Sequence, residues 1–178
     1  MADTALIVID MLNPYDHEDA DVLTENVEPV VPTLARLVAE ASERDVELVY
    51  VNDNYGDFAA TRDDLTRAAL EGRRPDLIEP ILPPEGVAFL QKARHSAFYS
   101  TALDHLLRQH ELETIVLTGQ VTEQCILYTA LDAYIRHFHI RVVRDAVAHI
   151  DEALGDAALQ MMQRNMRVDV VDAADCLS

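Results

Sequence analysis

The chain has 178 residues, of which 49% are hydrophobic, and a formal net charge of -18 that results from 14 basic and 32 acidic residues. This length fits a single domain, 1–178, and the hydrophobic content is high enough to bury a core, which excludes wholesale disorder. The charge argues against a nucleic-acid or membrane partner, because an acidic surface repels polyanions and the sequence has no local basic patch. We therefore expect a globular protein whose partner is a small-molecule substrate.

The N-terminal segment and the cysteines indicate the compartment. Only five apolar residues, 5–9, precede Asp10, which is too short for the apolar region of a signal peptide. No stretch approaches the ~20 apolar residues of a membrane span. The two cysteines, Cys125 and Cys176, are too few for a disulfide framework. We expect a cytoplasmic protein with free thiols.

Short apolar runs alternate with amphipathic stretches along the chain, a pattern typical of a parallel sheet with crossover helices. In chain order, the pattern predicts strands at 5–9, 46–51, 87–91, 114–118, 140–143 and 168–171, and helices at 29–44, 62–70, 101–110, 122–136 and 153–165. Residues 16–21 are expected to form an acidic loop, and 57–84 an irregular insertion of the kind that shapes a pocket mouth. The predicted fold class is α/β: a three-layer α-β-α, Rossmann-like arrangement around a six-stranded, mostly parallel sheet.

Three residues that can carry chemistry follow three of the predicted strands. Asp10 follows the first, Lys92 ends the third, and Cys125 comes six residues after Gly119 at the end of the fourth. Open parallel sheets bind ligands beyond the carboxyl ends of their strands, so these side chains are expected to converge. Lys92 is also the only lysine in the chain. A preference for arginine codons explains the thirteen arginines, but a site that needs a compact ammonium would resist replacement by the wider guanidinium.

The chemistry of these three residues favours nucleophilic catalysis. We expect Cys125 in the first turn of a helix, where unpaired N–H groups and the helix dipole, together with the Lys92 ammonium, stabilise a thiolate. Asp10 could accept the thiol proton and later donate it to the leaving group. Each residue alone also has a simple structural explanation, as a buried small side chain, a turn carboxylate or a surface lysine. Their convergence on one sheet edge makes the catalytic interpretation the stronger one.

The order and spacing of three segments resemble the isochorismatase-like cysteine hydrolases, a family that includes nicotinamidases and carbamoylsarcosine amidases. The segments are the apolar strand into Asp10, the run Lys-Ala-Arg-His-Ser-Ala-Phe at 92–98, and residues 119–125. The resemblance covers nearly the whole chain and implies a catalytic triad of Asp10, Lys92 and Cys125 that works without a cofactor. It also implies a cis peptide bond between Gln120 and Val121, with the backbone N–H groups of Val121 and Cys125 directed at the substrate oxyanion.

Two departures from the family pattern bear on the activity. Leu12 stands where the family often has glutamine. Where nicotinamidases have the Asp-x-His of a metal site, this chain has Asn52-Asp53-Asn54, and no histidine occurs between residues 18 and 94. Without imidazole ligands we expect no catalytic metal, which disfavours a nicotinamidase. The candidate pocket residues are Asn13, Tyr15, Asn54, Tyr55, Phe98 and Tyr128. For Tyr128, packing in the core is an equal alternative.

The function that these observations favour is hydrolysis of a small amide or ureide through an acyl-enzyme on Cys125. Isochorismatases proper act on a vinyl ether, so vinyl-ether hydrolysis with Asp10 as the acid stays open as an alternative. A non-catalytic interaction protein with the same fold is a second alternative. A redox thiol protein is disfavoured because no second cysteine lies near Cys125 in the sequence. Since relatives commonly form dimers or tetramers, the resemblance also implies a homo-oligomer.

Overall fold

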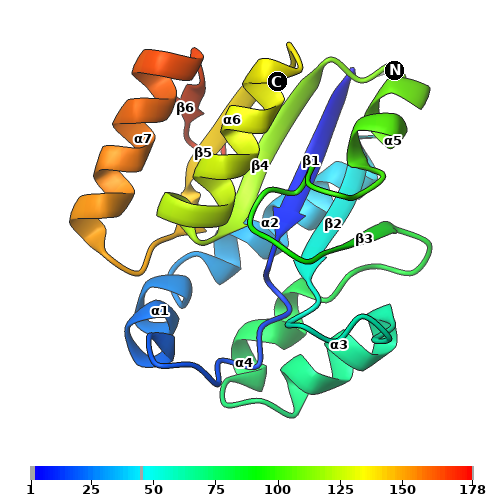
Figure 1. Cartoon of the computed structure of the whole chain (residues 1–178), viewed down its shortest axis with the longest axis vertical. Coiled ribbons are helices and arrows are strands. Elements are labelled where there is room, and N and C mark those ends of the chain that lie inside the picture. The colour runs from blue at the N-terminus through cyan, green and yellow to red at the C-terminus, as the bar shows by residue number, and fades with distance from the viewer. Residues whose placement is uncertain (1–2, 45, 178) are drawn as a thin grey trace.

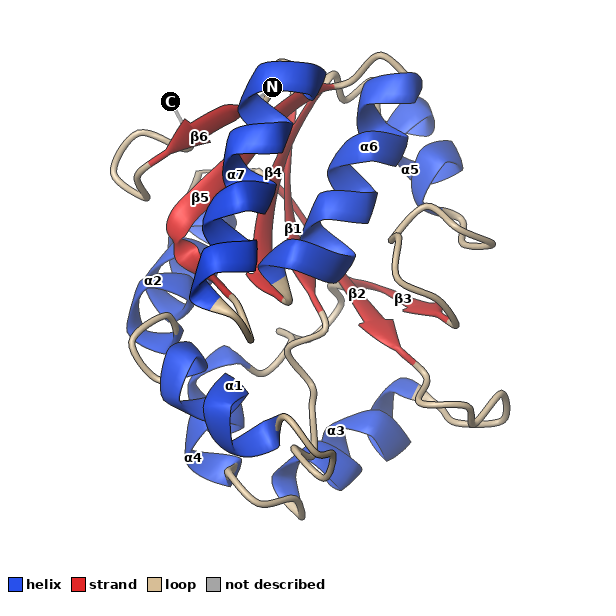
Figure 2. Cartoon of the chain, turned by 60° about the vertical axis from the view of Figure 1, so that its left-hand side comes forward, coloured by secondary structure: helices blue, strands red, loops and turns tan. Residues whose placement is uncertain are grey.

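The computed structural model describes residues 3–44 and 46–177, and it shows a six-stranded parallel sheet between two layers of helices (Figures 1 and 2). The strand order is β3-β2-β1-β4-β5-β6, and every neighbouring pair is parallel. The strands are β1 (Thr4–Ile9), β2 (Glu47–Asp53), β3 (Ala88–Lys92), β4 (Thr114–Gln120), β5 (His139–Ala148) and β6 (Asp169–Val171). The predicted fold class is confirmed.

The helices form the two outer layers (Figure 2). Their bounds are α1 (Ala20–Val27), α2 (Val31–Glu43), α3 (Arg62–Leu70), α4 (Pro75–Ile78), α5 (Leu103–Gln109), α6 (Leu127–Ile135) and α7 (Glu152–Met166), with a 3-10 turn η1 (Glu79–Ile81) and a π-helical turn η2 (Thr122–Ile126). Within residues 3–44 and 46–177, none of these helices is long and apolar enough to cross a bilayer.

The side chains of β1 divide the core into two parts. Leu6 and Val8 pack with buried residues of α1 and α2 on one face of the sheet. Ala5, Ile7 and Ile9 pack with buried residues of α5, α6 and α7 on the other face. Because successive side chains of a strand point to opposite faces, a central parallel strand has to be apolar at every position. This explains why β1 reads as an unbroken hydrophobic run.

The structure corrects three expectations from the sequence. Residues 20 and 21, expected in an acidic loop, begin α1, because Ala20, Leu23 and Val27 share one face of the helix and are buried. Within the expected irregular insertion, α4 and η1 place apolar side chains in the core, so part of that segment is structural. The fifth strand also continues beyond 143 to Ala148, past an irregularity in its pairing with β4.

The strand order changes direction between β1 and β4, which makes this pair the switch point of the sheet. These two strands pair directly although more than 100 residues separate them, and the chain leaves them toward opposite sides of the sheet. Gly119 permits their close approach at the carboxyl end. It has a φ of +108°, and a Cβ there would clash with the carbonyl oxygen of Ile9. Asp10 directly follows β1 at this edge of the sheet, and the turn that carries Cys125 follows β4.

Candidate active site

Lys92 connects the other two triad residues. Its Nζ lies 2.8 Å from Asp10 Oδ2 and 3.5 Å from Cys125 Sγ. Lys92 is at the end of β3, and β2 lies between β3 and β1, so the side chain must cross the end of β2 to reach Asp10. A long, unbranched side chain with a compact charge meets this requirement. The structure therefore brings together all three side chains that the sequence analysis singled out.

Asp10 is held by backbone and side-chain contacts at the ends of two neighbouring strands. Its backbone is in the left-handed region, with a φ of +55°, and its N–H donates to the carbonyl of Val51 at 3.0 Å. Oδ1 accepts a 2.7 Å hydrogen bond from the N–H of Asp53. This contact leaves Oδ2 for Lys92, so the orientation of the carboxylate is defined.

Asp53 contributes a second carboxylate to the site. The sequence analysis did not include this residue among the site residues. Its Oδ2 lies 3.5 Å from Lys92 Nζ, and its residue pairs directly with Lys92 in the β2–β3 register. The strand pattern could have identified it, because Asp53 ends β2, which lies between β1 and β3, and therefore lies at the same edge of the sheet. Lys92 thus has two carboxylate neighbours, one of which is closer than the other.

The loop that follows Asp10 is held by side chains from two strands. Gln120 Nε2 donates to the Asp10 carbonyl at 2.6 Å, while its Oε1 accepts from the Tyr15 hydroxyl at 3.5 Å. On the opposite side, Asn52 accepts from the N–H of Leu12 at 2.9 Å and donates to its carbonyl at 3.1 Å. Buried amide side chains that satisfy backbone groups in this way fix the path of a loop. The network positions Asp10 through its backbone.

Cys125 lies in the π-helical turn η2, directly after β4. The peptide bond between Gln120 and Val121 is cis, at the position that the resemblance implies. Glu123 attaches η2 to the start of α7, since its Oε1 accepts from the N–H groups of Ile150 and Asp151, both at 2.9 Å. The turn that carries the sulfur is therefore attached to the start of α7.

The electrostatics of the site differ from the expectation of a resting thiolate. Burial raises the pKa of the Cys125 thiol, and the Asp10 carboxylate raises it further, against the opposing effect of Lys92. Burial also raises the pKa of Asp10, although Lys92 and Cys125 oppose this. Burial disfavours the charge of Lys92, but Asp10, Cys125 and Asp53 outweigh it, so the pKa of Lys92 lies above its ordinary value. These shifts favour a thiol at Cys125, beside a carboxylate of increased basicity, over the thiolate that the sequence analysis expects.

Three candidate pocket residues point inward and have structural partners. Asn13 is buried, and its Oδ1 accepts from the N–H of Tyr15 at 2.7 Å. Tyr15 is fully buried and contacts Gln120. Phe98 packs against Phe138 with ring centroids 5.8 Å apart. Phe98 therefore occupies the position of a core residue rather than of a pocket wall.

Of the other three candidates, one is buried and two are partly exposed. Asn54 is buried, and it lines a cavity at the carboxyl ends of β2 and β3. The hydroxyl of Tyr55, a half-exposed residue, donates to the Leu12 carbonyl at 3.0 Å. Tyr128 is 43% exposed on α6, with its ring centroid 5.5 Å from that of His95. The alternative that Tyr128 packs in the core is therefore wrong.

The residues at the nicotinamidase-type metal position do not fit a metal ion. The amide of Asn52 is engaged by Leu12, and the carboxylate of Asp53 contacts Lys92. Among the residues that the structure describes, no group of three or more His, Cys, Asp or Glu side chains is arranged to hold an ion. At this position the polar side chains therefore bind other groups of the protein.

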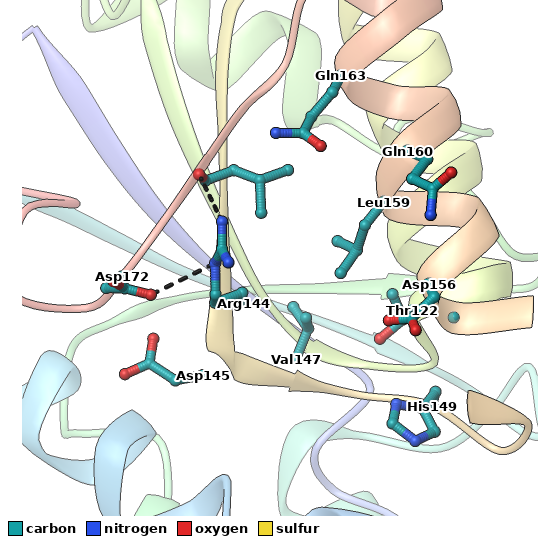
Figure 3. Close-up of a pocket in the computed structure, with 12 residues that line it drawn as sticks. Thr122, Arg144, Asp145, Val147, His149, Asp156, Leu159, Gln160, Gln163 and Asp172 are labelled. Carbon is teal, nitrogen blue, oxygen red and sulfur yellow. Dashed lines mark hydrogen bonds and ion pairs between the residues drawn. The ribbon is translucent and has the colours of Figure 1, made fainter. Parts of the chain in front are cut away.

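A second polar cavity, of about 590 Å³, lies between β5, α7 and β6 (Figure 3). Its lining includes Thr122 of η2 but none of the three triad residues. The Arg144 guanidinium lies 3.4 Å from Asp172, and both side chains are more than half exposed. The dashed lines in Figure 3 mark this ion pair and the hydrogen bond from Arg144 to the carbonyl of Val170. The charges of this cavity thus remain in contact with water.

Comparison with known proteins identifies the family. Residues 4–175 match the model of the isochorismatase domain. The chain belongs to the isochorismatase family. It is 32% identical, over 95% of its length and 93% of the relative's, to an uncharacterized isochorismatase family protein, YaaI, from Bacillus subtilis. It is 28% identical to the ureidoacrylate amidohydrolase RutB of Methylorubrum extorquens, over 90% of this chain and 76% of the relative.

The fold of a solved family member is also closely similar. The crystal structure of N-carbamoylsarcosine amidase from Thermoplasma acidophilum superposes with a TM-score of 0.75 at 28% identity, covering 98% of both chains. The resemblance inferred from the sequence is therefore confirmed. The relatives of this isochorismatase family protein include amidohydrolases, which act on amide-type substrates.

Proposed function

We propose that this isochorismatase family protein hydrolyses a small amide or ureide through an acyl-enzyme on Cys125. The observation that carries the proposal is the position of Lys92 Nζ, in contact with both Asp10 Oδ2 and Cys125 Sγ. The ammonium compensates the negative charge whether it resides on the carboxylate or on the sulfur. A proton can therefore move between Asp10 and Cys125 without leaving an unpaired buried charge. Two family members act on ureidoacrylate and N-carbamoylsarcosine, as their names state, which supports a carbamoyl or amide substrate.

The proposed reaction begins with a neutral thiol. When a substrate carbonyl carbon reaches Cys125 Sγ, Asp10 accepts the thiol proton as the carbon–sulfur bond forms. The N–H groups of Val121 and Cys125 stabilise the oxyanion. The C–N bond then breaks, and the amine departs with the proton from Asp10. Water attacks the thioester while Asp10 takes its proton, and the carbon–sulfur bond breaks. The acid is released, and the proton returns from Asp10 to the departing thiolate, which regenerates the thiol.

The raised pKa of Asp10 supports this role and also keeps one alternative open. A carboxylate of increased basicity is a better acceptor for a thiol proton. The same shift would suit Asp10 as a protonated acid in hydrolysis of a vinyl ether, a reaction that does not need the sulfur. The two chemistries differ in their dependence on Cys125, which the experiment below uses.

The test is Cys125→Ala, assayed on a panel of amides and ureides and on isochorismate. We expect activity on the amide panel to be abolished, with a melting temperature close to that of the parent, because alanine fits the space of the buried thiol. Mass spectrometry of the parent enzyme with substrate should show an acyl adduct on Cys125. Cys176→Ala is the matched control, since Cys176 is fully buried in the other half of the core and its Sγ donates to the Ala173 carbonyl at 3.3 Å.

The outcomes separate the alternatives. Retained amide hydrolysis in Cys125→Ala would contradict the acyl-enzyme. Hydrolysis of isochorismate that survives in this variant would establish the vinyl-ether reaction instead. A parent protein that forms no adduct and hydrolyses neither class would favour the non-catalytic interaction protein.

We also propose that the protein is a cytoplasmic homo-oligomer that binds neither nucleic acid nor membrane. Its net charge of -18 opposes binding to polyanions, and both cysteines are free. Tyr128, Leu131 and Ile135 are exposed at helical spacing on α6, which supports association through that face. Size-exclusion chromatography with light scattering measures the molar mass in solution. We expect the mass of a dimer or a tetramer rather than the 19.9 kDa of one chain.

A further inference from the structure

The carboxylate of Glu123 connects the turn η2 to the loop between β5 and α7. Its Oε1 accepts from the N–H groups of Ile150 and Asp151, both at 2.9 Å. Hydrogen bonds of this kind, from backbone N–H groups to a carboxylate, are roughly twice as strong as those between neutral groups. The other oxygen, Oε2, is shielded from water and has no hydrogen-bond partner among residues 3–44 and 46–177. Oε1 alone therefore provides the connection.

The loop that receives Glu123 is itself held by α1 and α7. Asn26 of α1 donates to the His149 carbonyl at 3.0 Å. Asp151 caps α7, since its carboxylate accepts from the N–H of Leu154 at 2.9 Å. Gly155, in the first turn of α7, lies so close to His149 that an added Cβ would be 2.8 Å from the Cβ of this histidine. Because contacts from two helices fix the loop, it can act as a rigid support for η2.

The backbone hydrogen bonds that close η2 are local. The N–H groups of Gln124 and Ile126 both donate to the Val121 carbonyl at 3.1 Å, and no side chain caps the start of the turn. π-helical turns are rare and frequently occur at functional sites. Cys125 comes two residues after Glu123 within this turn, so a displacement of Glu123 also displaces the sulfur.

We propose that Glu123 is a positioning residue, which holds the sulfur of Cys125 at its contact with Lys92. Sγ lies 3.5 Å from Lys92 Nζ, so a small shift of the turn would separate the two groups. A misplacement of about 1 Å can lower the rate of an enzyme by about 100-fold. This inference rests on the proposed function for the reaction, but the placement of the sulfur can also be measured without a substrate, through its reactivity toward an alkylating reagent.

The first experiment compares Glu123→Ala and Glu123→Gln in the amide assay. We expect kcat of Glu123→Ala to fall about 10–100-fold with little change in KM, because the substitution changes the placement of the sulfur rather than substrate binding. Glu123→Gln should recover part of the loss, since its carbonyl oxygen can accept from the same two N–H groups. A folded Glu123→Ala with the kcat of the parent, or a Glu123→Gln as slow as Glu123→Ala, would overturn the proposal.

Asp64→Ala is the matched control for a loss of stability. Asp64 is also a carboxylate at the start of a helix, and its Oδ2 accepts from the N–H of Thr61 at 2.9 Å in the capping box of α3. We expect this variant to melt at a lower temperature but to keep the kcat of the parent. Circular dichroism establishes that each variant is folded at the assay temperature. An equal loss of kcat in Asp64→Ala and Glu123→Ala would mean that stability explains both, and would overturn the positioning role.

Alkylation of Cys125 tests the placement of the sulfur independently of hydrolysis. Burial is the largest cause of the raised pKa of this thiol, so a turn released from Glu123 should admit water to the sulfur and increase its reactivity. In the Cys176→Ala background, we expect Glu123→Ala to react with iodoacetamide several-fold faster at neutral pH, with Glu123→Gln between this variant and the parent. Equal rates in all three would overturn the proposal. A difference in rates, together with a parent that forms no acyl adduct, would overturn only the proposed reaction.

Discussion

The charged side chains of Asp10 and Lys92 are buried, whereas those in the cavity of Figure 3 are exposed to water. At the triad, the Lys92 side chain is fully excluded from water and that of Asp10 is 10% exposed, with 2.8 Å between them. In the second cavity, Arg144 and Asp172 are 3.4 Å apart but their side chains are 54% and 67% exposed. Burial strengthens electrostatic interactions and shifts pKa values, whereas water screens an exposed pair. The two regions therefore differ in the desolvation of their charged side chains, and not in whether such side chains are present.

The largest effect is expected from Lys92→Arg. The positive charge is kept, but the guanidinium is wider than the ammonium and has no space between Asp10 and Cys125. We expect kcat to fall about 100-fold or more, because misplacement of the reacting groups by about 1 Å has effects of that size. Steady-state kinetics on the best amide of the panel provides the measurement.

The matched control for this substitution is Arg164→Lys, which exchanges the same two residue types on the surface of α7. Circular dichroism establishes that Lys92→Arg is folded at the assay temperature. A folded Lys92→Arg with kcat near that of the parent would show that the buried ammonium does not position the triad.

A smaller effect concerns the pH dependence of thiol modification. Because burial and Asp10 raise the pKa of Cys125, the resting thiol is protonated through neutral pH and only its small thiolate fraction reacts. In the Cys176→Ala background, the rate of alkylation by iodoacetamide should therefore increase continuously as the pH rises from 6 to past the ordinary thiol value of about 8.5. The measurement is the mass of carbamidomethylated protein as a function of time at each pH.

The pH at which the alkylation rate reaches its plateau distinguishes a resting thiol from a resting thiolate at Cys125. A rate that reaches its plateau below pH 8 would mean that Lys92 and the turn outweigh burial, and that the sulfur is ionised before substrate binds. Cys125→Ala provides the background rate, which reports the buried Cys176 alone.

The smallest effect is expected from Arg144→Gln in the cavity of Figure 3. Because the ion pair with Asp172 is exposed, its loss should lower the free energy of unfolding by less than ~1 kcal/mol. Urea denaturation measures this change, and kcat/KM on the amide panel should remain that of the parent. A large loss of activity would mean that the second cavity is coupled to the triad, and the contrast between the two regions would have to be revised.

The sequence predicted that Asp10, Lys92 and Cys125 converge, because their positions follow from the strand pattern. An apolar run that ends in Asp10, a single lysine at the end of another strand and a cysteine soon after Gly119 all lie at the carboxyl edge of a parallel sheet. Local patterns missed the contribution of Asp53 and Gln120, since their contacts join segments that are far apart in the chain. They also missed the start of α1, where acidic residues on the solvent face conceal an apolar spacing.

The sequence by itself determined the fold class and the family, and it singled out Asp10, Lys92 and Cys125 as candidates, because hydrophobic periodicity and motif spacing are properties of the residue order. Only the tertiary structure decided how far these side chains lie from one another and how deeply they are buried. The direction of a pKa shift responds to those distances and to burial rather than to residue order. This is why the helix position of Cys125 suggested a thiolate, while the surroundings of Cys125 favour a thiol.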